Sequence, residues 1–289
     1  MMLSIFIVNW NVREALRSCL ASIAANKGNV PAEVIVADNN SSDGSVDMVR
    51  SEFPWVMVLA MNKNLGFARA NNRALAHASG AYVLFLNPDT SVQPGALATL
   101  VGYLEQHASV AMVAPKLVNA DGSFQYGSVR RNPTLGAMLI ILLKLQHLMP
   151  ASRLLREYYF ADFAHEEEQE VDQVMGAAMC VRRSTLDRYG FFDEKFFLWF
   201  EEVDLCLRFR KAGEKIVYVP SARITHLGGQ SFKQQLPLVK QRIYNRSALH
   251  FFMKHHGILA SVPLLLAMLV NLLLAGFYQL LVSHGNKVR

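Results

Sequence analysis

Short apolar segments alternate with helical segments along the first 90 residues, and this alternation restricts the fold more than any other feature of the chain. Residues 3–9 (LSIFIVN) are almost entirely apolar and β-branched, which is typical of a strand covered on both faces. The expected strands are residues 3–9, 33–37, 55–61 and 81–87, and the expected helices are residues 11–25, 41–53 and 64–79. This order predicts an α/β fold with a doubly wound, mostly parallel sheet and flanking helices.

Polar side chains follow three of these strands at the point where each strand ends. They are Asn9, Asp38 and the tripeptide Asn87-Pro88-Asp89. The carboxyl ends of parallel strands meet at one edge of the sheet, where folds of this kind bind their ligands. Asn, Asp and Pro also favour turns, so one such cluster alone would be weak evidence. Carboxylates at two of the three strand ends favour a ligand site.

An uncharged apolar segment, residues 258–282, lies near the C-terminus. Its length matches the roughly 20 residues that a bilayer-spanning helix needs. The basic residues before it are Lys233, Lys240, Arg242, Arg246 and Lys254. A basic stretch beside an apolar one is typical of a segment that contacts anionic lipid. Pro263 and Asn271 interrupt the apolar run, so spanning, re-entrant and interfacial helices all stay open, and membrane association is favoured over a buried core helix.

Composition agrees with a large α/β domain, since 52% of the 289 residues are apolar. The formal charge of +6 suits nucleic acid, an anionic membrane or a phosphorylated substrate, and the position of the basic residues favours the membrane. The three cysteines lack metal-ligand spacing and the N-terminus lacks the features of a signal peptide, so we expect a reduced cytosolic compartment. Residues 132–150 are expected to form a surface-seeking amphipathic helix, and residues 165–172 a solvated acidic loop.

Three acidic residues lie close together in a later segment. Glu201, Glu202 and Asp204 open a predicted helix directly after an aromatic cluster that includes Trp199. The helix dipole alone favours carboxylates in a first helical turn. Burial of an acid beside aromatic side chains can also raise its pKa, and a raised pKa suits a general base. A lone histidine is more often structural than a ligand, but His226 lies just beyond a predicted strand and before two glycines, which predicts an accessible imidazole.

Seven sequence motifs together resemble a known family. They are FIVNWN, VIVADNNSSDGS, NKNLGFARANNRAL, LFLNPDT, GAAMCVRR, FDEKFFLWFEEVDLCLR and ARITHLGG, and they occur in this order over residues 3–230. In type and order they resemble the family-2 inverting glycosyltransferases of GT-A fold, and more narrowly the rhamnosyltransferase branch. The resemblance implies that a sugar moves, with inversion, from a nucleoside-diphosphate sugar to an acceptor hydroxyl. It also implies help from a divalent cation, Mg²⁺ or Mn²⁺.

The resemblance implies roles for single residues as well. Asp89 matches the last acid of the family's Asp-x-Asp motif and, with His226, would bind the metal. Glu202 matches the catalytic base, although Asp is commoner there. Asp38 would recognise the nucleotide base, and Asn9 would line the nucleoside pocket. The full set expected to contact the nucleotide-sugar is Asn9, Asp38, Gly66, Arg69, Asn71, Asn87 and Asp89.

Several of these matches leave alternatives open. Arg69 is interpreted equally well as a phosphate contact or as an exposed helical arginine. Asn87 stands where many relatives have the first Asp of the motif, so one carboxylate is missing. Trp199, Glu201 and Asp204 are expected to orient the acceptor or the site rather than to act as the base.

Together with the apolar segment, the resemblance implies an enzyme at the cytoplasmic face of the inner or plasma membrane. Residues 1–232 would form the catalytic domain, with a nucleotide-sugar-binding half (1–115) and an acceptor and catalytic half (116–232). A basic juxtamembrane helix (233–257) and a membrane-associated or transmembrane helix (258–283) would follow.

The expected reaction moves rhamnose from dTDP-rhamnose to a lipid-linked or polysaccharide acceptor in cell-surface glycan synthesis, with no nucleic-acid partner. One alternative is the same transfer from a UDP-hexose or UDP-galactofuranose donor. Another is a non-catalytic nucleotide-sugar-binding subunit of a polysaccharide assembly complex.

Overall fold

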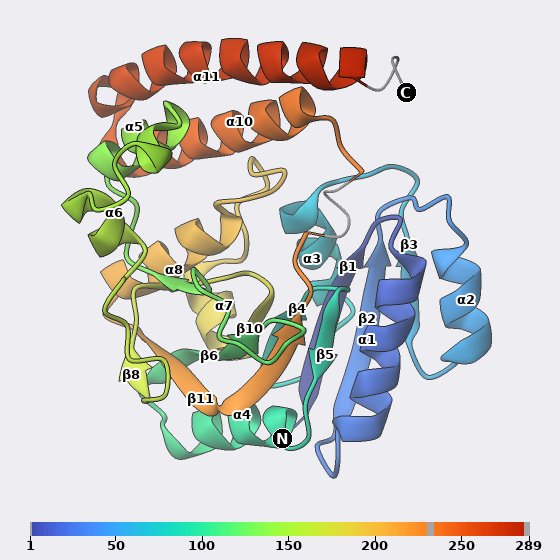
Figure 1. Cartoon of the computed structure of the whole chain (residues 1–289). Coiled ribbons are helices and arrows are strands. Elements are labelled where there is room, and N and C mark those ends of the chain that lie inside the picture. The colour runs from blue at the N-terminus through green and yellow to red at the C-terminus, as the bar shows by residue number, and fades with distance from the viewer. Residues whose placement is uncertain (1, 230–233, 286–289) are drawn as a thin grey trace.

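The computed structural model describes residues 2–229 and 234–285 and contains a central mixed sheet with helices on both faces (Figure 1). The strands of this sheet are β1 (Leu3–Asn9), β2 (Ala32–Asp38), β3 (Met57–Ala60), β4 (Tyr82–Leu86), β5 (Thr90–Val92), β6 (Val110–Val118), β8 (Gln169–Glu170), β10 (Ala178–Arg182) and β11 (Lys215–His226). Their order is β3-β2-β1-β4-β10-β6-β11-β5, and β8 pairs with β11. A separate small ribbon pairs β7 (Val129–Arg130) with β9 (Gln173–Val174).

Helices connect and cover these strands. They are α1 (Arg13–Asn26), α2 (Ser45–Glu52), α3 (Phe67–Leu75), α4 (Ala96–Gln106), α5 (Leu135–Leu142), α6 (Arg153–Tyr158), α7 (Arg183–Tyr189), α8 (Glu201–Lys211), α10 (Pro237–His256) and α11 (Ile258–Gly285), with a 3-10 turn η1 (Leu145–His147). The four strands expected from the sequence are present, and β1, β2, β3 and β4 run parallel to their neighbours in that half of the sheet. The expected α/β class with a mostly parallel sheet is therefore confirmed.

The two faces of the sheet build two separate hydrophobic cores. Ile5 and Ile7 of β1 belong to the core under α1, α2 and α4, whereas Phe6 belongs to the core under α3, α7 and α8. This division follows from strand geometry, since successive side chains point to opposite faces. The first strand is apolar at both kinds of position because both faces are covered.

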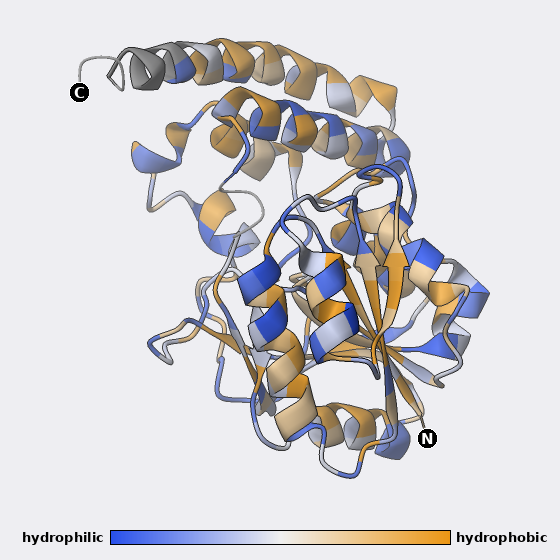
Figure 2. Cartoon of the chain, turned by 90° about the vertical axis from the view of Figure 1, so that its right-hand side faces the viewer, coloured by the Kyte–Doolittle hydropathy of each residue, from blue (hydrophilic) through white to orange (hydrophobic). Residues whose placement is uncertain are grey.

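A third hydrophobic core lies above the sheet and joins α5, α8, α10 and α11. Its residues include Phe200, Phe251 and Leu264. α10 and α11 pack along each other, and α11 also packs on α5 (Figure 1). Residues Ile258–Gly276 of α11 are long and apolar enough to cross a membrane, and 28% of that stretch is buried within the structure. Figure 2 shows α11 as apolar along most of its length, lying over the mixed surface of α10.

The expectation of a surface-seeking amphipathic helix over residues 132–150 is wrong in two respects. Residues 132–150 do not form one amphipathic helix: α5 ends at Leu142, Lys144 takes a left-handed conformation (φ 59°), and η1 follows. α5 is also less of a surface helix than expected, because Ala137 and Met138 are fully buried in the third core.

The basic segment 233–257 is not all available to lipid. His250 and Lys254 both contact the carboxylate of Asp193, so part of its charge is neutralised within the protein. The boundary expected at residues 232–233, and Lys233 itself, lie outside the described residues, and the division into domains stays a prediction.

Candidate active site

Parallel pairing of β1 and β2 brings the first two polar strand ends together. Asn9 lies directly opposite Asp38 in the register, and the Asn9 amide donates a hydrogen bond to the Asp38 carboxylate (2.8 Å). The backbone N–H of Ser41 donates to the other Asp38 oxygen (2.8 Å). Both Asn9 and Asp38 are buried, so the strand ends form a rigid polar floor at the edge predicted for a ligand.

Asn39 joins this floor to the start of α3. Its side-chain amide donates to the carbonyl of Gly66 (3.2 Å), and its side-chain oxygen accepts from the N–H of Leu65 (3.1 Å). Gly66 has φ +83°, and a Cβ placed there would lie 2.3 Å from the carbonyl oxygen of Phe197. Asn71 lies behind this contact, buried, with its amide donating to the carbonyl of Phe67 (3.0 Å).

The third strand end meets the last strand of the sheet. Because β5 pairs with β11, Thr90 lies opposite His226, and Asp89 lies beside the imidazole. Nε2 of His226 is 3.3 Å from Oδ1 of Asp89 and 3.4 Å from the side-chain nitrogen of Asn87. Asp89 and His226 are each 6% exposed at the side chain, so water screens this contact little.

Gln125 fixes the tautomer of His226. Its amide nitrogen donates to the backbone carbonyl of His226 (3.1 Å), which turns its oxygen toward Nδ1 of the ring (2.8 Å). A neutral imidazole then carries its proton on Nδ1 and presents the lone pair of Nε2 beside Asp89. An imidazole nitrogen next to a carboxylate oxygen is a donor set that fits a divalent cation. Among the residues that the structure describes, no group of three His, Cys, Asp or Glu forms a metal site.

The two glutamates of the later motif begin α8. Trp199 and Phe200 both have positive φ, 64° and 69°, in the turn that leads into the helix. Such conformations are strained for these residue types and often lie at functional sites. Glu202 faces Gly176, where a Cβ would lie 3.6 Å from the glutamate Cβ. The absence of a side chain at Gly176 leaves space beside the Glu202 carboxylate.

Burial changes the acidity of both glutamates. It raises the pKa of Glu201 well above its ordinary value, and the neighbouring charge of Glu202 raises it further. Burial also raises the pKa of Glu202, and the positive charge of Arg130 opposes that rise. One oxygen of each carboxyl is buried without a hydrogen-bond partner among the described residues. The arrangement favours a protonated Glu201 beside a Glu202 that can exchange a proton.

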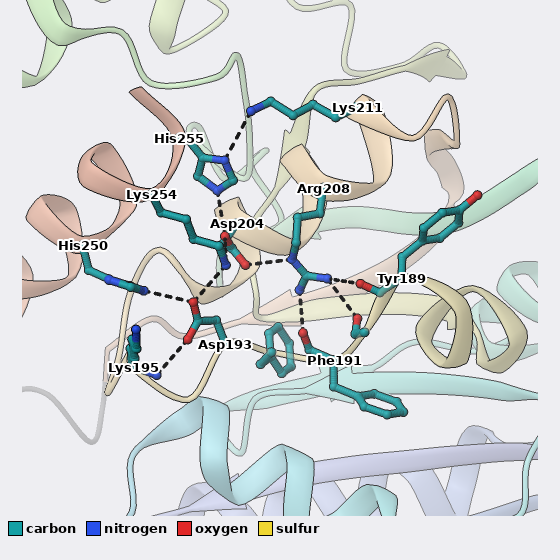
Figure 3. A network of polar contacts seen from close by, with 12 residues as sticks. Tyr189, Phe191, Asp193, Lys195, Asp204, Arg208, Lys211, His250, Lys254 and His255 are labelled. Carbon is teal, nitrogen blue, oxygen red and sulfur yellow. Dashed lines mark hydrogen bonds and ion pairs between the residues drawn. The ribbon is translucent and has the colours of Figure 1, made fainter. Parts of the chain in front are cut away.

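Asp204 lies in the same first turn of α8 and has different contacts. Its carboxylate accepts from Arg208 (2.9 Å) and lies 2.7 Å from both Lys254 and His255 (Figure 3). Burial would raise its pKa, but the contacts with His255, Lys254 and Arg208 outweigh burial and lower it. Asp204 therefore stays ionised and joins α8 to α10, and its expected role in orienting the site stays a prediction.

Two cavities meet at this edge of the sheet. The smaller, 300 Å³, is lined by Asn39, Gly66, Asn87 and Asp89, among others. The larger, 710 Å³, runs from Asn87 and His226 past Glu201 and Glu202 toward α5, α6 and α10. Asn87 lines both cavities, so a ligand in one can reach a ligand in the other.

The structure separates the predicted residues into those near the cavities and those behind them. Arg69 is half-exposed, lies 3.5 Å from Glu194, and lines neither of the two cavities. Asn71 supports the α3 start from behind. Sequence reasoning missed Gln125 and Arg130, which line the larger cavity and lie outside every recognised motif. It also missed Asn39, although the Asp38-Asn39-Asn40 cluster carried the signal.

Comparison with known proteins identifies the family of the chain. Residues 4–164, more than half of the chain, match the family model described as Glycosyl transferase family 2. The N-acetylglucosaminyl-diphospho-decaprenol L-rhamnosyltransferase of Mycobacterium tuberculosis is 32% identical over 209 residues, 68% of this chain and 66% of that protein. Rhamnosyltransferase WbbL of Escherichia coli is 30% identical over 56% of this chain and 60% of its own length. The chain thus spans less than two thirds of the length of these relatives.

Solved structures show the same fold at low identity. GalNAc-T7 with UDP, GalNAc and Mn²⁺ aligns with a TM-score of 0.63 at 15% identity, over 88% of this chain and 51% of that one. The mannosyltransferase PcManGT of Pyrobaculum calidifontis, in complex with GDP-Man and Mn²⁺, aligns with a TM-score of 0.58 at 16% identity, over 98% of this chain and 75% of that one. The fold is therefore GT-A, as expected.

Proposed function

The chain belongs to glycosyl transferase family 2, and on that premise we propose that it is an inverting glycosyltransferase. It transfers rhamnose from dTDP-rhamnose to a hydroxyl of a lipid-linked or polysaccharide acceptor in cell-surface glycan synthesis. The observation that carries this proposal is that Glu202, Asn87 and His226 line one cavity, which adjoins the pocket at the strand ends. The rhamnosyltransferases among the similar proteins support rhamnose as the sugar.

Glu202 is the proposed general base. It takes the proton of the acceptor hydroxyl while that oxygen bonds to the anomeric carbon, and the bond from this carbon to the donor diphosphate breaks. The electron pair of the broken bond leaves with the nucleoside diphosphate. A raised pKa suits Glu202 to this task, because a base works best when its pKa approaches the working pH. Attack opposite the leaving group inverts the anomeric carbon.

The donor would lie along the strand ends. Asn9, Asp38 and Asn39 would hold the nucleoside, and Gly66 lets the start of α3 pack closely against Phe197 beside them. Asp89 and His226 would hold a divalent cation, Mg²⁺ or Mn²⁺. When bound, such a cation supplies neutralisation of the charge that develops on the leaving diphosphate.

α11 would place the protein on the cytoplasmic face of the membrane. Its outward face carries the exposed apolar residues Leu259, Val262, Leu266, Leu269 and Leu273. The opposite face, with Leu264 and Met268, is buried against α5 and α10. Because α11 runs along α10, we infer that it lies in the membrane surface and does not cross it.

The discriminating measurement is metal-dependent release of nucleoside diphosphate from a panel of dTDP-, UDP- and GDP-sugars with acceptor extracts. Rhamnose transfer from dTDP-rhamnose is the expected result. Turnover only with UDP-hexose or UDP-galactofuranose would replace the donor and keep the enzyme class. If every sugar binds but none is turned over, the protein is instead a nucleotide-sugar-binding subunit, the function that Asn87 in place of an acid would favour.

A further inference from the structure

Three cations and only two carboxylates line the larger cavity. The cations are Arg130, Lys144 and Lys240, and the carboxylates are Glu201 and Glu202. Burial favours the protonated form of Glu201, which removes one of the two negative charges. The excess of positive charge indicates a cavity built for an anionic ligand.

None of these cations forms an ion pair with another described residue. Arg130 donates to the carbonyl of Gly127 (2.8 Å) and the hydroxyl of Tyr158 (3.3 Å), and Lys144 donates to the side-chain oxygen of Gln241 (3.3 Å). By contrast, Lys254 is held by two carboxylates, Asp193 and Asp204 (Figure 3). The charge of Arg130 acts on Glu202, and burial lowers the pKa of Lys144. Lys144 and Lys240, which no described carboxylate neutralises, are the cations left for a ligand.

The donor has a separate place. Asp89 lines only the smaller of these two cavities, and none of the three cations lines it. A nucleotide-sugar held at the strand ends would thus leave Lys144 and Lys240 free, since they lie on the side of α5 and α10. The acceptor must enter the larger cavity to reach Glu202, which makes it the candidate ligand for these lysines.

The walls of the cavity contain aromatic and aliphatic side chains as well as the charged ones. Aromatic side chains stand near the glutamates, namely Trp199, Tyr158, Tyr159 and Tyr244. Ile141 and Leu142 of α5 lie on the α11 side, and α5 packs on α11, whose outer face is apolar. Aromatic, cationic and apolar side chains thus line one cavity, and these are the surfaces that a sugar, a charged group and a lipid chain require.

We propose that Lys144 and Lys240 bind the diphosphate of a lipid-diphosphate-linked sugar, with its sugar against the aromatic wall beside Arg130 and Glu202. This inference rests on the proposed function and chooses between the two acceptor classes that the proposed function leaves open. A lysine ammonium suits a phosphate as a mobile point charge, and charge-assisted hydrogen bonds are the strong ones. A neutral polysaccharide would leave both ammonium groups unused.

The test is binding of decyl diphosphate to the full-length protein by isothermal titration calorimetry, with decyl glucoside as the uncharged ligand. We expect wild type to bind decyl diphosphate more tightly than decyl glucoside. In the double variant Lys144→Met/Lys240→Met, the ratio of the two affinities should fall at least tenfold. Lys144→Arg/Lys240→Arg keeps most of it. Lys215→Met is the matched control, because Lys215 is exposed at the start of β11, lines neither cavity, and should leave binding unchanged.

Three results would overturn the inference. The first is equal diphosphate affinity in wild type and the methionine double variant. The second is an equal loss for decyl glucoside, which would indicate a collapsed cavity. The third is a loss of affinity for anionic vesicles alone, which would place the lysines on the bilayer. Binding needs neither donor nor turnover, so failure of rhamnose transfer with an intact diphosphate preference would refute the proposed function alone.

Discussion

Nε2 of His255 lies 2.7 Å from Oδ1 of Asp204, and this contact connects the C-terminal end of α10 to the first turn of α8 (Figure 3). Both side chains are nearly or fully buried. The proposed base, Glu202, is two residues before Asp204 on the same helix. The helix that carries the base is therefore held in place by the same helix on which α11 packs.

The first prediction separates the two adjacent glutamates. Glu202→Gln should lower kcat about 10²- to 10⁴-fold, the usual contribution of a general base. Glu201→Gln should keep most of the activity, because a glutamine resembles the protonated form that burial favours at Glu201. The measurement is the sugar-transfer rate of each purified variant compared with wild type. Full activity in Glu202→Gln would show that the base is another residue.

A second prediction concerns pH and activity. The pKa of Glu202 is raised, so activity should fall with decreasing pH already above the ordinary glutamate value of about 4.3. Arg130→Met removes a cation that lowers this pKa, so the acid limb of the kcat/KM profile should move to higher pH. Arg130→Lys, which keeps the charge, should move it less. An acid limb that is the same in wild type and Arg130→Met would contradict the assignment of Glu202.

A third prediction concerns pH and stability. The pKa values of Asp193 and Asp204 lie below their ordinary range; burial opposes this, but contacts with His250, His255 and Lys254 outweigh it. Groups with a lowered folded-state pKa stabilise the fold fully above the unfolded value of about 3.9, and this stability is lost as the pH falls further. The raised pKa of Glu201 acts in the opposite direction, since its protonated form suits the folded state.

Urea unfolding at pH 6 and pH 3 measures this effect. The free energy of unfolding should be smaller at pH 3, and the difference should shrink in the double variant Asp193→Asn/Asp204→Asn. Asp187→Asn is the control, because among the described residues the exposed Asp187 pairs only with Arg183, on its own helix. An equal pH difference in wild type and the double variant would show that other groups cause it.

The fourth prediction tests the close approach at Gly66. Gly66→Ala should destabilise the protein by more than about 2 kcal/mol, because φ is positive and the new Cβ would meet the carbonyl of Phe197. Gly95→Ala is a matched control, since Gly95 also has positive φ (+79°) but has no atom within 4 Å of the added Cβ. It should cost only about 1 kcal/mol. Thermal unfolding of both variants separates the two effects. Gly95→Ala reports backbone strain alone, and Gly66→Ala reports backbone strain together with the steric clash at Phe197.

The fifth prediction concerns the outward face of α11. Leu269→Glu/Leu273→Glu should reduce partition into anionic vesicles at least tenfold, because each buried leucine is worth about 1.5–3 kcal/mol. Met57→Glu, at an exposed apolar position on β3, should not change it. Protease access supplies a second readout: both ends of α11 should be cleaved from the same side of the vesicle. Protection of one end would indicate a crossing helix.

The hydrophobic pattern predicted the first four strands well, because strands that are covered on both faces have continuous apolar sequences. The strand-end residues Asn9, Asp38 and Asp89 were predictable for the same reason, since parallel pairing fixes which ends meet. Gln125 was not predictable, because it lies in a loop and reaches His226 only through the pairing of β6 with β11.

The cationic residues of the larger cavity illustrate a second limit. Lys144 interrupts an apolar segment, and its left-handed backbone ends α5, but no local pattern places it in the same cavity as Lys240 of a distant helix. The role of Lys254 was also hidden. A basic residue beside an apolar segment looks available for lipid, and only the tertiary structure shows that it neutralises Asp193 and Asp204.

The packing of α11 determines how a protein truncated before this helix would behave in solution. Leu264, Ala267 and Met268 share a core with Phe251 of α10 and Met138 of α5, and the Asn271 amide donates to the carbonyl of Leu142 (2.6 Å). Removing everything beyond Gly257 would strip the cover from α5 and α10 and leave their apolar faces as new surface. Detergent or replacement of those side chains would then be needed for solubility. One face of α11 is part of the enzyme's interior, and removing the helix would reshape the cavity where the acceptor is proposed to bind.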